Sequence, residues 1–153
     1  MTNVKTNGMK IKRKGAVAVV PKSNVILDIK TEPFLIIRRS SKVLAPNTLC
    51  FPGGGIEPEE TPQEAVQREF QEELGVSIRD SRAIWENITP WNVQLVWFLA
   101  FLDDPSVPFF PDPNEVSEVV WLTLPDLLLS QDCLQSNRPF LQKVLNGSIS
   151  LFV

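Results

Sequence analysis

Three glutamates, Glu69, Glu72 and Glu73, lie within five residues of one another in the segment REFQEELG. Residues three and four positions apart share one face of a helix, where like charges repel each other and weaken the helix. Three carboxylates within one helical turn can instead share a hard divalent cation, because Mg²⁺ prefers oxygen ligands and is often held jointly by carboxylates and substrate phosphates. The alternative interpretation is a solvated acidic face, which is common on exposed helices.

Three consecutive glycines, Gly53 to Gly55, follow Pro52 and come shortly before the glutamates. Glycine lets a backbone approach a ligand closely, and a loop that leads into a helix is a favourable place for anions. We therefore predict a glycine-rich loop whose backbone, at Gly54 and Gly55 in particular, contacts a substrate phosphate or the same cation.

The helix that carries the glutamates has strong boundary signals. Thr61 is a good N-cap, Pro62 fits the first helical position, and Glu64 completes a Thr-x-x-Glu capping box. Gly75 is a natural C-cap. Apolar residues four positions apart predict the buried stripe, and the glutamates occupy the stripe beside it; these apolar residues are Val66, Phe70 and Leu74.

Apolar and β-branched runs separated by Pro and Gly predict the remaining elements. The run at 93–102 is apolar on both faces, so we expect a strand in the centre of a sheet. Residues 22–33 read as a loop or a weak hairpin, and the Pro-rich residues 103–114 read as a loop. Other strands are expected at 16–20, 34–39, 49–51, 76–85 and 119–122, and short helices at 125–130 and 138–145.

The chain of 153 residues is 43% hydrophobic and 22% charged, as expected for one globular domain. We predict a loose leader at 1–14 and a single domain at 15–153, with an α/β (α+β) fold in which helices pack on a mixed sheet. The leader lacks the apolar core of a secretory signal, and the run Leu95 to Leu102 is far shorter than the ~20 residues that span a bilayer. Cys50 and Cys133 have no CxxC spacing and are expected to be reduced thiols, which indicates a soluble, cytoplasmic protein.

Charge and residue types exclude several functions. The formal net charge of −3 gives no overall attraction for nucleic acid or anionic membranes, so an anionic substrate needs local Arg and Lys residues or a bound cation. The chain contains no His, which excludes a Ser-His-Asp triad and a His-ligated zinc site. The apolar and Trp content leaves room for a homodimer.

The segment from Gly54 to Val76 resembles the Nudix box, the signature G-x5-E-x7-R-E-U-x-E-E-x-G-U, in which U is a bulky aliphatic residue. Five residues separate Gly54 from Glu60, and seven separate Glu60 from Arg68, so that every fixed position is filled. Phe70 departs mildly, being aromatic where an aliphatic residue is usual. The similarity extends more loosely to the segments GAVAVV, FLIIRR, FPGGG and EVSEVVWLTLPDL.

The resemblance implies a Nudix fold, an α/β/α sandwich with a mixed β-sheet. It also implies hydrolysis of a nucleoside diphosphate linked to another group, by water attack on phosphorus. By position, Glu69, Glu72 and Glu73 would hold Mg²⁺ or Mn²⁺, and the carbonyl of Gly53 would join them. Arg68 would pair with a box carboxylate and orient it for catalysis.

A carboxylate is the expected general base, because the chain has no His. Divalent ions lower the pKa of a bound water, and one glutamate then accepts its proton. In the family this base comes from the box or from a later loop. The candidates are Glu73, Glu115 and Glu118, and Glu72 is also expected to be essential for turnover.

Two arginines and one tryptophan outside the box are candidate substrate contacts. Arg38 and Arg39 end a strand near the expected cleft, and alternate strand residues face opposite sides, so one of them is expected to reach a phosphate. Trp91 follows Pro90 in a predicted loop, where it either stacks on a base or forms part of the core.

The substrate class stays open among ADP-ribose, NADH, coenzyme A, dinucleoside polyphosphates and nucleoside triphosphates. A catalytically silent Nudix-fold domain that binds nucleotides or regulates a partner is the alternative, although every box carboxylate is present. A diphosphate isomerase would need a Cys and other residues that the sequence does not place. Calcium binding without catalysis is disfavoured, because the carboxylate spacing is not that of an EF-hand loop.

Overall fold

The computed structural model describes residues 5–6, 9–10 and 13–152. The helices are α1 (Pro62–Leu74), α2 (Leu124–Leu129) and α3 (Arg138–Leu145), with a 3-10 turn at Gln135–Asn137 before α3. The strands are β1 (Lys5–Thr6), β2 (Met9–Lys10), β3 (Arg13–Val19), β4 (Pro33–Arg39), β5 (Leu49–Cys50), β6 (Gly53–Gly55), β7 (Ile78–Ile88), β8 (Val93–Leu102) and β9 (Val116–Thr123).

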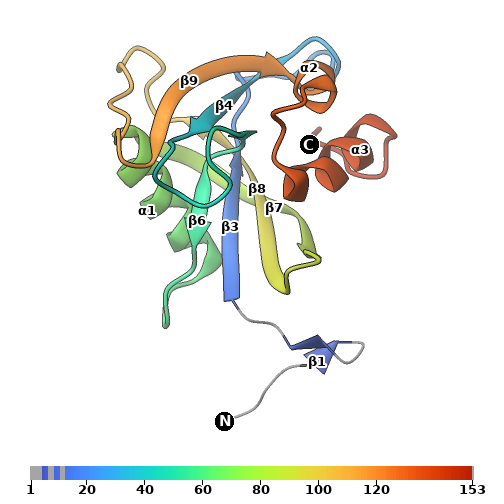
Figure 1. The fold of residues 1–153 in the computed structure, drawn as a ribbon. Helices are drawn as coiled ribbons and strands as arrows, with labels where there is room; N and C mark the ends of the chain where they lie inside the picture. Colours follow the sequence, from blue (N-terminus) through green and yellow to red (C-terminus); the bar gives the residue numbers. More distant parts are fainter. Residues whose placement is uncertain (1–4, 7–8, 11–12, 153) are drawn as a thin grey trace.

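A four-stranded mixed sheet in the order β6-β3-β8-β7 forms the centre of the molecule (Figure 1). Strands β3 and β8 are parallel, whereas β6 and β7 flank them in antiparallel orientation. The predicted central strand is therefore confirmed, since β8 has a partner on each side. A second, antiparallel sheet has the order β5-β4-β9, and a bridge between Pro21 and Phe34 links the end of β3 to β4.

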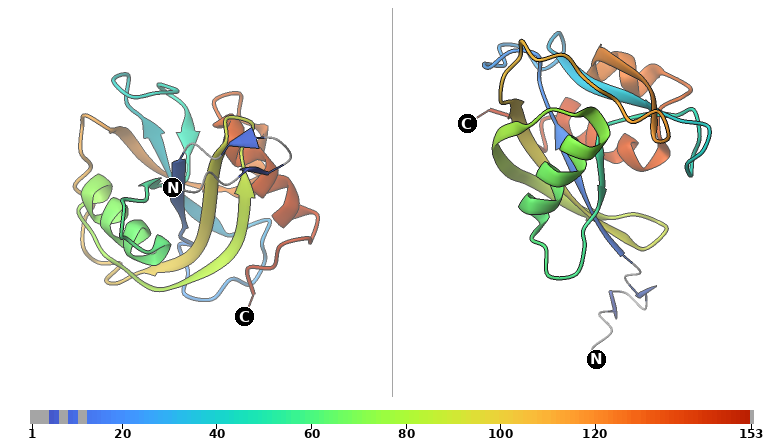
Figure 2. Two further views of the ribbon diagram at one scale, coloured as in Figure 1. Left: turned by 90° about the horizontal axis from the view of Figure 1, so that it is seen from below. Right: turned by 90° about the vertical axis from the view of Figure 1, so that its left-hand side faces the viewer.

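Helices cover the sheets from opposite sides, as Figures 1 and 2 show. Helix α1 packs on one side, where its buried residues Val66, Phe70 and Leu74 join alternate residues of β3 and β8 in one apolar cluster. Helices α2 and α3 pack on the other side, in a second cluster that includes Trp97 and Phe140. This arrangement is the predicted α/β/α sandwich with a mixed sheet. Among the described residues, no helix is long and apolar enough to cross a membrane.

Aromatic packing fixes the start of α3 against the central sheet. The rings of Trp97 and Phe140 are stacked with their centroids 4.3 Å apart, and Phe51 meets both rings edge-on. Both Trp97 and Phe140 are fully buried. Phe51, which follows β5, and the first turn of α3 are thereby held on the same side of the sheet.

Helix α1 begins and ends where its sequence predicts. Thr61 accepts a hydrogen bond from the Glu64 backbone N–H, the Glu64 side chain accepts one from the Thr61 backbone N–H, and Pro62 is the first helical residue. Gly75 ends the helix in the left-handed conformation, with φ of 70°. The predicted capping box and C-cap are confirmed.

Thr61→Ala is expected to lower the free energy of unfolding by about 1 kcal/mol, because it leaves an N-terminal amide of α1 without its acceptor. Urea denaturation checks this value. Thr61→Ser keeps the hydroxyl and serves as the control, and a Thr61→Ala protein as stable as wild type would contradict the role of the cap.

Several sequence expectations need correction. Gly53–Gly55 is not a loop but the short strand β6, which pairs with β3. Residues 22–32 contain no strand, so the loop interpretation holds there. Part of the predicted leader at 1–14 lies outside the described residues, and β3 already begins at Arg13, two residues inside it. The strands β7 and β9 extend beyond their predicted ends because pairing with β8 and β4 continues there.

Candidate metal and substrate site

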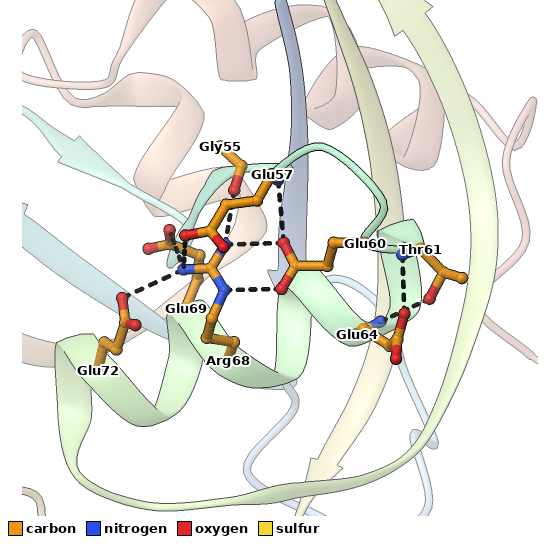
Figure 3. Close-up of polar contacts among 8 residues, drawn as sticks. All are labelled: Gly55, Glu57, Glu60, Thr61, Glu64, Arg68, Glu69 and Glu72. Atoms are coloured by element: carbon orange, nitrogen blue, oxygen red, sulfur yellow. Dashed lines mark hydrogen bonds and ion pairs between the residues drawn. The ribbon is translucent and has the colours of Figure 1, made fainter.

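Arg68 is the centre of a dense polar network on the exposed side of α1 (Figure 3). Its Nε donates to Glu60 Oε2 at 2.7 Å and its Nη2 to Glu60 Oε1 at 2.9 Å, a bidentate pair. Nη1 donates to Glu69 Oε1 at 2.9 Å and to Glu72 Oε2 at 3.3 Å, and Nη2 also donates to the Gly55 carbonyl at 2.9 Å. Arg68 thus connects α1 to the end of β6 and orients Glu69.

The bidentate pair fixes Glu60 as a carboxylate. Hydrogen bonds from Arg68, and a weaker contribution from the Glu57 backbone N–H, lower the pKa of Glu60 to about 2. The pKa of Arg68 is raised in turn, mainly by Glu60. The contact of Arg68 with box carboxylates is therefore present as the resemblance implied, and its part in catalysis stays a prediction.

A cavity of about 240 Å³ lies between α1, β6 and the loop before β9, and three carboxylates line it: Glu69, Glu73 and Glu115. Glu73 is buried, and its Oε1 accepts a hydrogen bond from the Gly53 backbone N–H at 2.9 Å. Burial, reinforced by Glu69 and Glu115, raises the pKa of Glu73 to about 8, against the opposing effects of the Gly53 N–H and Arg39.

Glu69 shares this environment. Burial raises its pKa, and the neighbouring carboxylates Glu72 and Glu115 add to the rise, whereas Arg68 opposes it. Glu69 and Glu73, one turn apart on α1, therefore both have raised pKa values, and the positive charge near them does not offset their burial. A divalent cation in the cavity would relieve this deficit, because an opposite charge within a few ångströms favours the ionised carboxylate.

The donor set fits Mg²⁺ or Mn²⁺. All the side-chain donors are carboxylate oxygens, which hard divalent ions prefer. Within the described ranges, no three acidic or cysteine side chains converge closely enough to hold an ion as they stand. Arg68 engages both Glu69 and Glu72, and Glu72 points outward with 58% of its side chain exposed. Arg68 engages Glu69 through Oε1 alone, so Glu69 would hold an ion through Oε2, whereas Glu72 would have to turn inward and leave Arg68 to join it.

The loop that delivers Glu115 is anchored to the end of α1. Backbone N–H groups of Phe110 and Asp112 donate to the carbonyls of Leu74 and Glu73 at 2.8 and 2.9 Å. These bonds satisfy carbonyls that the last turn of a helix otherwise leaves free. The loop predicted at 103–114 thus continues to Glu115 and places this carboxylate opposite the helix.

A larger cavity of about 730 Å³ lies on the opposite side of β6. All three glycines of β6 line both cavities, so this strand is the partition between them. A Cβ on Gly53 would overlap the Ala16 carbonyl, and one on Gly54 would overlap the carboxylate of Glu69. At Gly53 and Gly54, therefore, a side chain would need its neighbours to shift, whereas Gly55 has room for one.

Arg39 is the side chain that reaches both cavities. Its Nε donates to the Leu44 carbonyl at 2.8 Å, which ties it to the loop between β4 and β5. Arg38 faces elsewhere: it pairs with Glu118 at 3.1 Å and with Asp132 at 3.0 Å, and it lines neither cavity. The structure therefore brings Arg39 to the carboxylates and leaves Arg38 and Glu118 bound to each other outside the site.

Trp91 lines the larger cavity from the turn before β8 and is 58% exposed. The prediction that Trp91 forms part of the core is therefore wrong. Asn137 was not singled out by the sequence, yet it lines the same cavity and is only 3% exposed. The Oδ1 of Asn137 accepts a hydrogen bond from the Phe51 backbone N–H at 3.0 Å, and the side chain does not cap α3. An Asn before a predicted helix suggests a cap, so the sequence did not indicate that Asn137 lines a cavity.

Both cysteines are free and buried, and both line the larger cavity. Burial raises the pKa of Cys50 to about 12. A thiol in this state is a poor nucleophile at neutral pH, because the thiolate is the reactive form.

The free energy of unfolding of the metal-free protein is expected to fall by roughly 2–4 kcal/mol between pH 5 and pH 8. The pKa of Glu73 is about 8 in the folded protein, against the ordinary 4.5. Between these values Glu73 loses its proton in the unfolded chain but keeps it in the folded protein, so rising pH favours unfolding. Urea denaturation in EDTA at four pH values measures the slope. Glu73→Gln should flatten it, and Glu86→Gln, an exposed position on β7, should not. An equal slope in both variants would contradict the assignment.

The site thus combines three carboxylates beside the glycine strand with a sandwich of helices around a mixed sheet. The family model described as NUDIX domain matches residues 20–144, and the chain belongs to this family. The Nudix resemblance of the box is thereby confirmed.

Individual relatives agree. Over 113 residues the chain is 34% identical to a Deinococcus radiodurans protein named NAD-capped RNA hydrolase NudC. The matched region is 71% of this chain and 39% of that protein. Over 93 residues it is 33% identical to a Klebsiella pneumoniae protein named nucleoside triphosphatase NudI, covering 61% of this chain and 52% of that one. The matched segments thus span about half, or less, of the curated relatives' lengths.

Solved structures share the fold. A MutT NUDIX hydrolase from Burkholderia pseudomallei superposes with a TM-score of 0.63 at 23% identity, over 86% of this chain and 97% of that one. A MutT protein from Methanosarcina mazei gives a TM-score of 0.65 at 19% identity, over 89% and 94% of the two chains. At these identities the likeness concerns the fold.

Proposed function

We propose that this chain is a Mg²⁺- or Mn²⁺-dependent diphosphohydrolase that cleaves a nucleoside diphosphate linked to another group, by water attack on phosphorus. The observation that carries the proposal is the juxtaposition of Glu69, Glu73 and Glu115 at one cavity, with a three-glycine partition to a second cavity large enough for a nucleoside. Family membership supports the same reaction class.

The carboxylates divide the work. Glu69 and Glu73, with the Gly53 backbone beside them, would hold the ion, and Glu72 would join after leaving Arg68. When bound, the ion supplies charge neutralisation for the diphosphate and a lower pKa for the attacking water. Glu115 is the favoured general base, because it lines the cavity from a different element and is not hydrogen-bonded to β6 as Glu73 is.

The substrate would lie across the partition. The diphosphate would pass over Gly54 and Gly55, where no side chain obstructs it, with Arg39 beside it as a charge-assisted donor. The nucleoside would occupy the larger cavity. There Trp91 offers a ring for stacking, and Asn137, whose orientation is fixed by Phe51, offers its amide N–H groups to a base.

A nucleotide-binding domain without turnover is the second candidate. The observation that favours it is the engagement of Glu69 and Glu72 by Arg68, which competes with any cation. In that case Mg²⁺ would leave the thermal midpoint unchanged, whereas a metal enzyme is stabilised by the ion that it binds.

A phosphate-release screen with Mg²⁺ or Mn²⁺ tests the proposal against ADP-ribose, NADH, coenzyme A, dinucleoside polyphosphates and nucleoside triphosphates. Hydrolysis of at least one compound, abolished by EDTA, is the expected result. Binding of nucleotides without hydrolysis of any would instead support the second candidate. Homodimer formation stays a prediction, which light scattering checks.

A further inference from the structure

Ser40 is a buried polar residue that the proposed reaction does not use. It directly follows Arg39 at the end of β4, and only 4% of it is exposed. Its backbone N–H donates to the Glu115 carbonyl at 2.8 Å, and its Oγ donates to the Asn114 carbonyl at 2.7 Å. One residue therefore holds two consecutive carbonyls of the loop that leads into β9.

The carboxylate of Glu115 is not fixed by an ion pair of its own. Glu115 is exposed, and the salt bridges found in the described part of the chain do not include it. It lines the smaller cavity together with Glu69 and Glu73, whose charges repel it. The backbone must therefore hold Glu115 at the cavity against this repulsion.

A β-bulge lies directly beside this backbone. Arg38 and Arg39 pair with Glu118 and Val116, so Ser117 is an extra residue in β9. A bulge bends its strand and redirects the side chains beside it. Beyond the bulge, the two hydrogen bonds from the residue after Arg39 continue the attachment of the loop to β4.

The loop is held on two sides. On the side of α1, the Asp112 carbonyl accepts the Glu115 N–H at 3.0 Å. On the side of β4, the Lys42 N–H donates to Ser40 Oγ at 3.2 Å, and Lys42 Nζ donates to Asn114 Oδ1 at 3.1 Å. The hydroxyl of Ser40 is thus both donor and acceptor, and its removal loosens the β4 side while the α1 side stays in place.

We propose that Ser40 is a positioning residue, which fixes the backbone at 114 and 115 so that the Glu115 carboxylate reaches the attacking water. The inference rests on the proposed function, in which Glu115 is the general base. Ser40 lines neither cavity, so it touches neither the ion nor the substrate. Its effect on the reaction therefore passes through Glu115.

Ser40→Ala is expected to lower kcat about tenfold, because the Asn114 carbonyl loses its donor and the loop moves. KM should stay within about twofold, since the substrate keeps its contacts. Ser40→Cys fills the same space with a weak S–H donor and should show a similar loss without a gap in the packing. Ser41→Ala makes the same change at the exposed neighbouring residue and should keep wild-type kinetics.

A double-mutant cycle assigns the effect to Glu115. In Glu115→Gln, which already lacks the base, Ser40→Ala should lower kcat no further. If Ser40 supported the fold in general, the two losses would multiply. Multiplying losses, or a wild-type kcat in Ser40→Ala or in Glu115→Gln, would overturn the inference.

Hydrogen exchange in EDTA reads the position of the loop without turnover. Amides of residues 112–116 should exchange faster in Ser40→Ala than in the wild type, whereas those of α1 should not change. Unchanged exchange at 112–116 overturns the inference, even if the phosphate-release screen finds hydrolysis. Faster exchange confined to these residues, in a protein that hydrolyses nothing with Mg²⁺ or Mn²⁺, supports the fixing of Glu115 by Ser40 and contradicts the hydrolase assignment alone.

Discussion

Glu73→Gln is expected to lower kcat by roughly 10²–10⁴-fold while the protein remains folded, because it removes a ligand of an ion whose charge stabilisation is worth several kcal/mol. Glu73 is the most buried carboxylate of the cavity, and its Oε1 holds the Gly53 N–H at the partition. The amide keeps the shape and the contact with Gly53 but cannot neutralise a cation. Because burial already disfavours ionised Glu73, the variant should be at least as stable as wild type above pH 7.

Steady-state kinetics with Mg²⁺, beside thermal unfolding of the same samples, measures both effects. Glu86→Gln is the matched control, since it makes the same change on the exposed side of β7. Metal titration adds a further check, because the activating concentration of Mg²⁺ should rise in Glu73→Gln alone. A soluble, well-folded Glu73→Gln protein with wild-type kcat would remove Glu73 from the site.

Gly54→Ala should reduce kcat/KM by roughly 10²-fold, the loss typical of a catalytic group displaced by about 1 Å. The new methyl would overlap the carboxylate of Glu69, which is the end of a flexible side chain and can move aside. The backbone at Gly54 is not left-handed, so alanine is tolerated in the strand. The loss should therefore appear in activity and hardly in stability.

Gly55→Ala provides the comparison within the same strand. Its Cβ would meet no atom within 4 Å, so the same substitution one residue later should cost far less activity. Equal losses in the two variants would mean that the methyl group hinders the substrate generally and that the position of Glu69 is not the cause. Unfolding of Gly54→Ala would show that the carboxylate cannot move.

The helix and its box were predictable because their signals are local. A capping box, a proline at the first position and a C-cap glycine are contained within fifteen residues, and α1 forms as they indicate. The apolar runs likewise identified β3, β4 and β8. What these patterns describe is the conformation of one segment at a time.

The site itself depends on contacts between distant segments, which no local pattern reports. Asn137 approaches Phe51 only because α3 stacks on β8. The pairing of β4 with β9 determines that Arg39, and not Arg38, reaches the carboxylates. The glycines read as a loop because glycine is rare in strands. Their pairing with β3 follows from the close approach that a side chain would prevent.

Residues 103–115 are attached to the end of α1, and this attachment makes the position of Glu115 independent of the length of the loop before it. Its anchors are main-chain groups at Phe110 and Asp112, which persist when side chains are exchanged. Residues 103–108 are exposed, so extra length can be accommodated at that tip without relocating Glu115. An insertion at residues 103–108 is therefore expected to change what this part of the surface binds. It would leave the position of Glu115 unchanged.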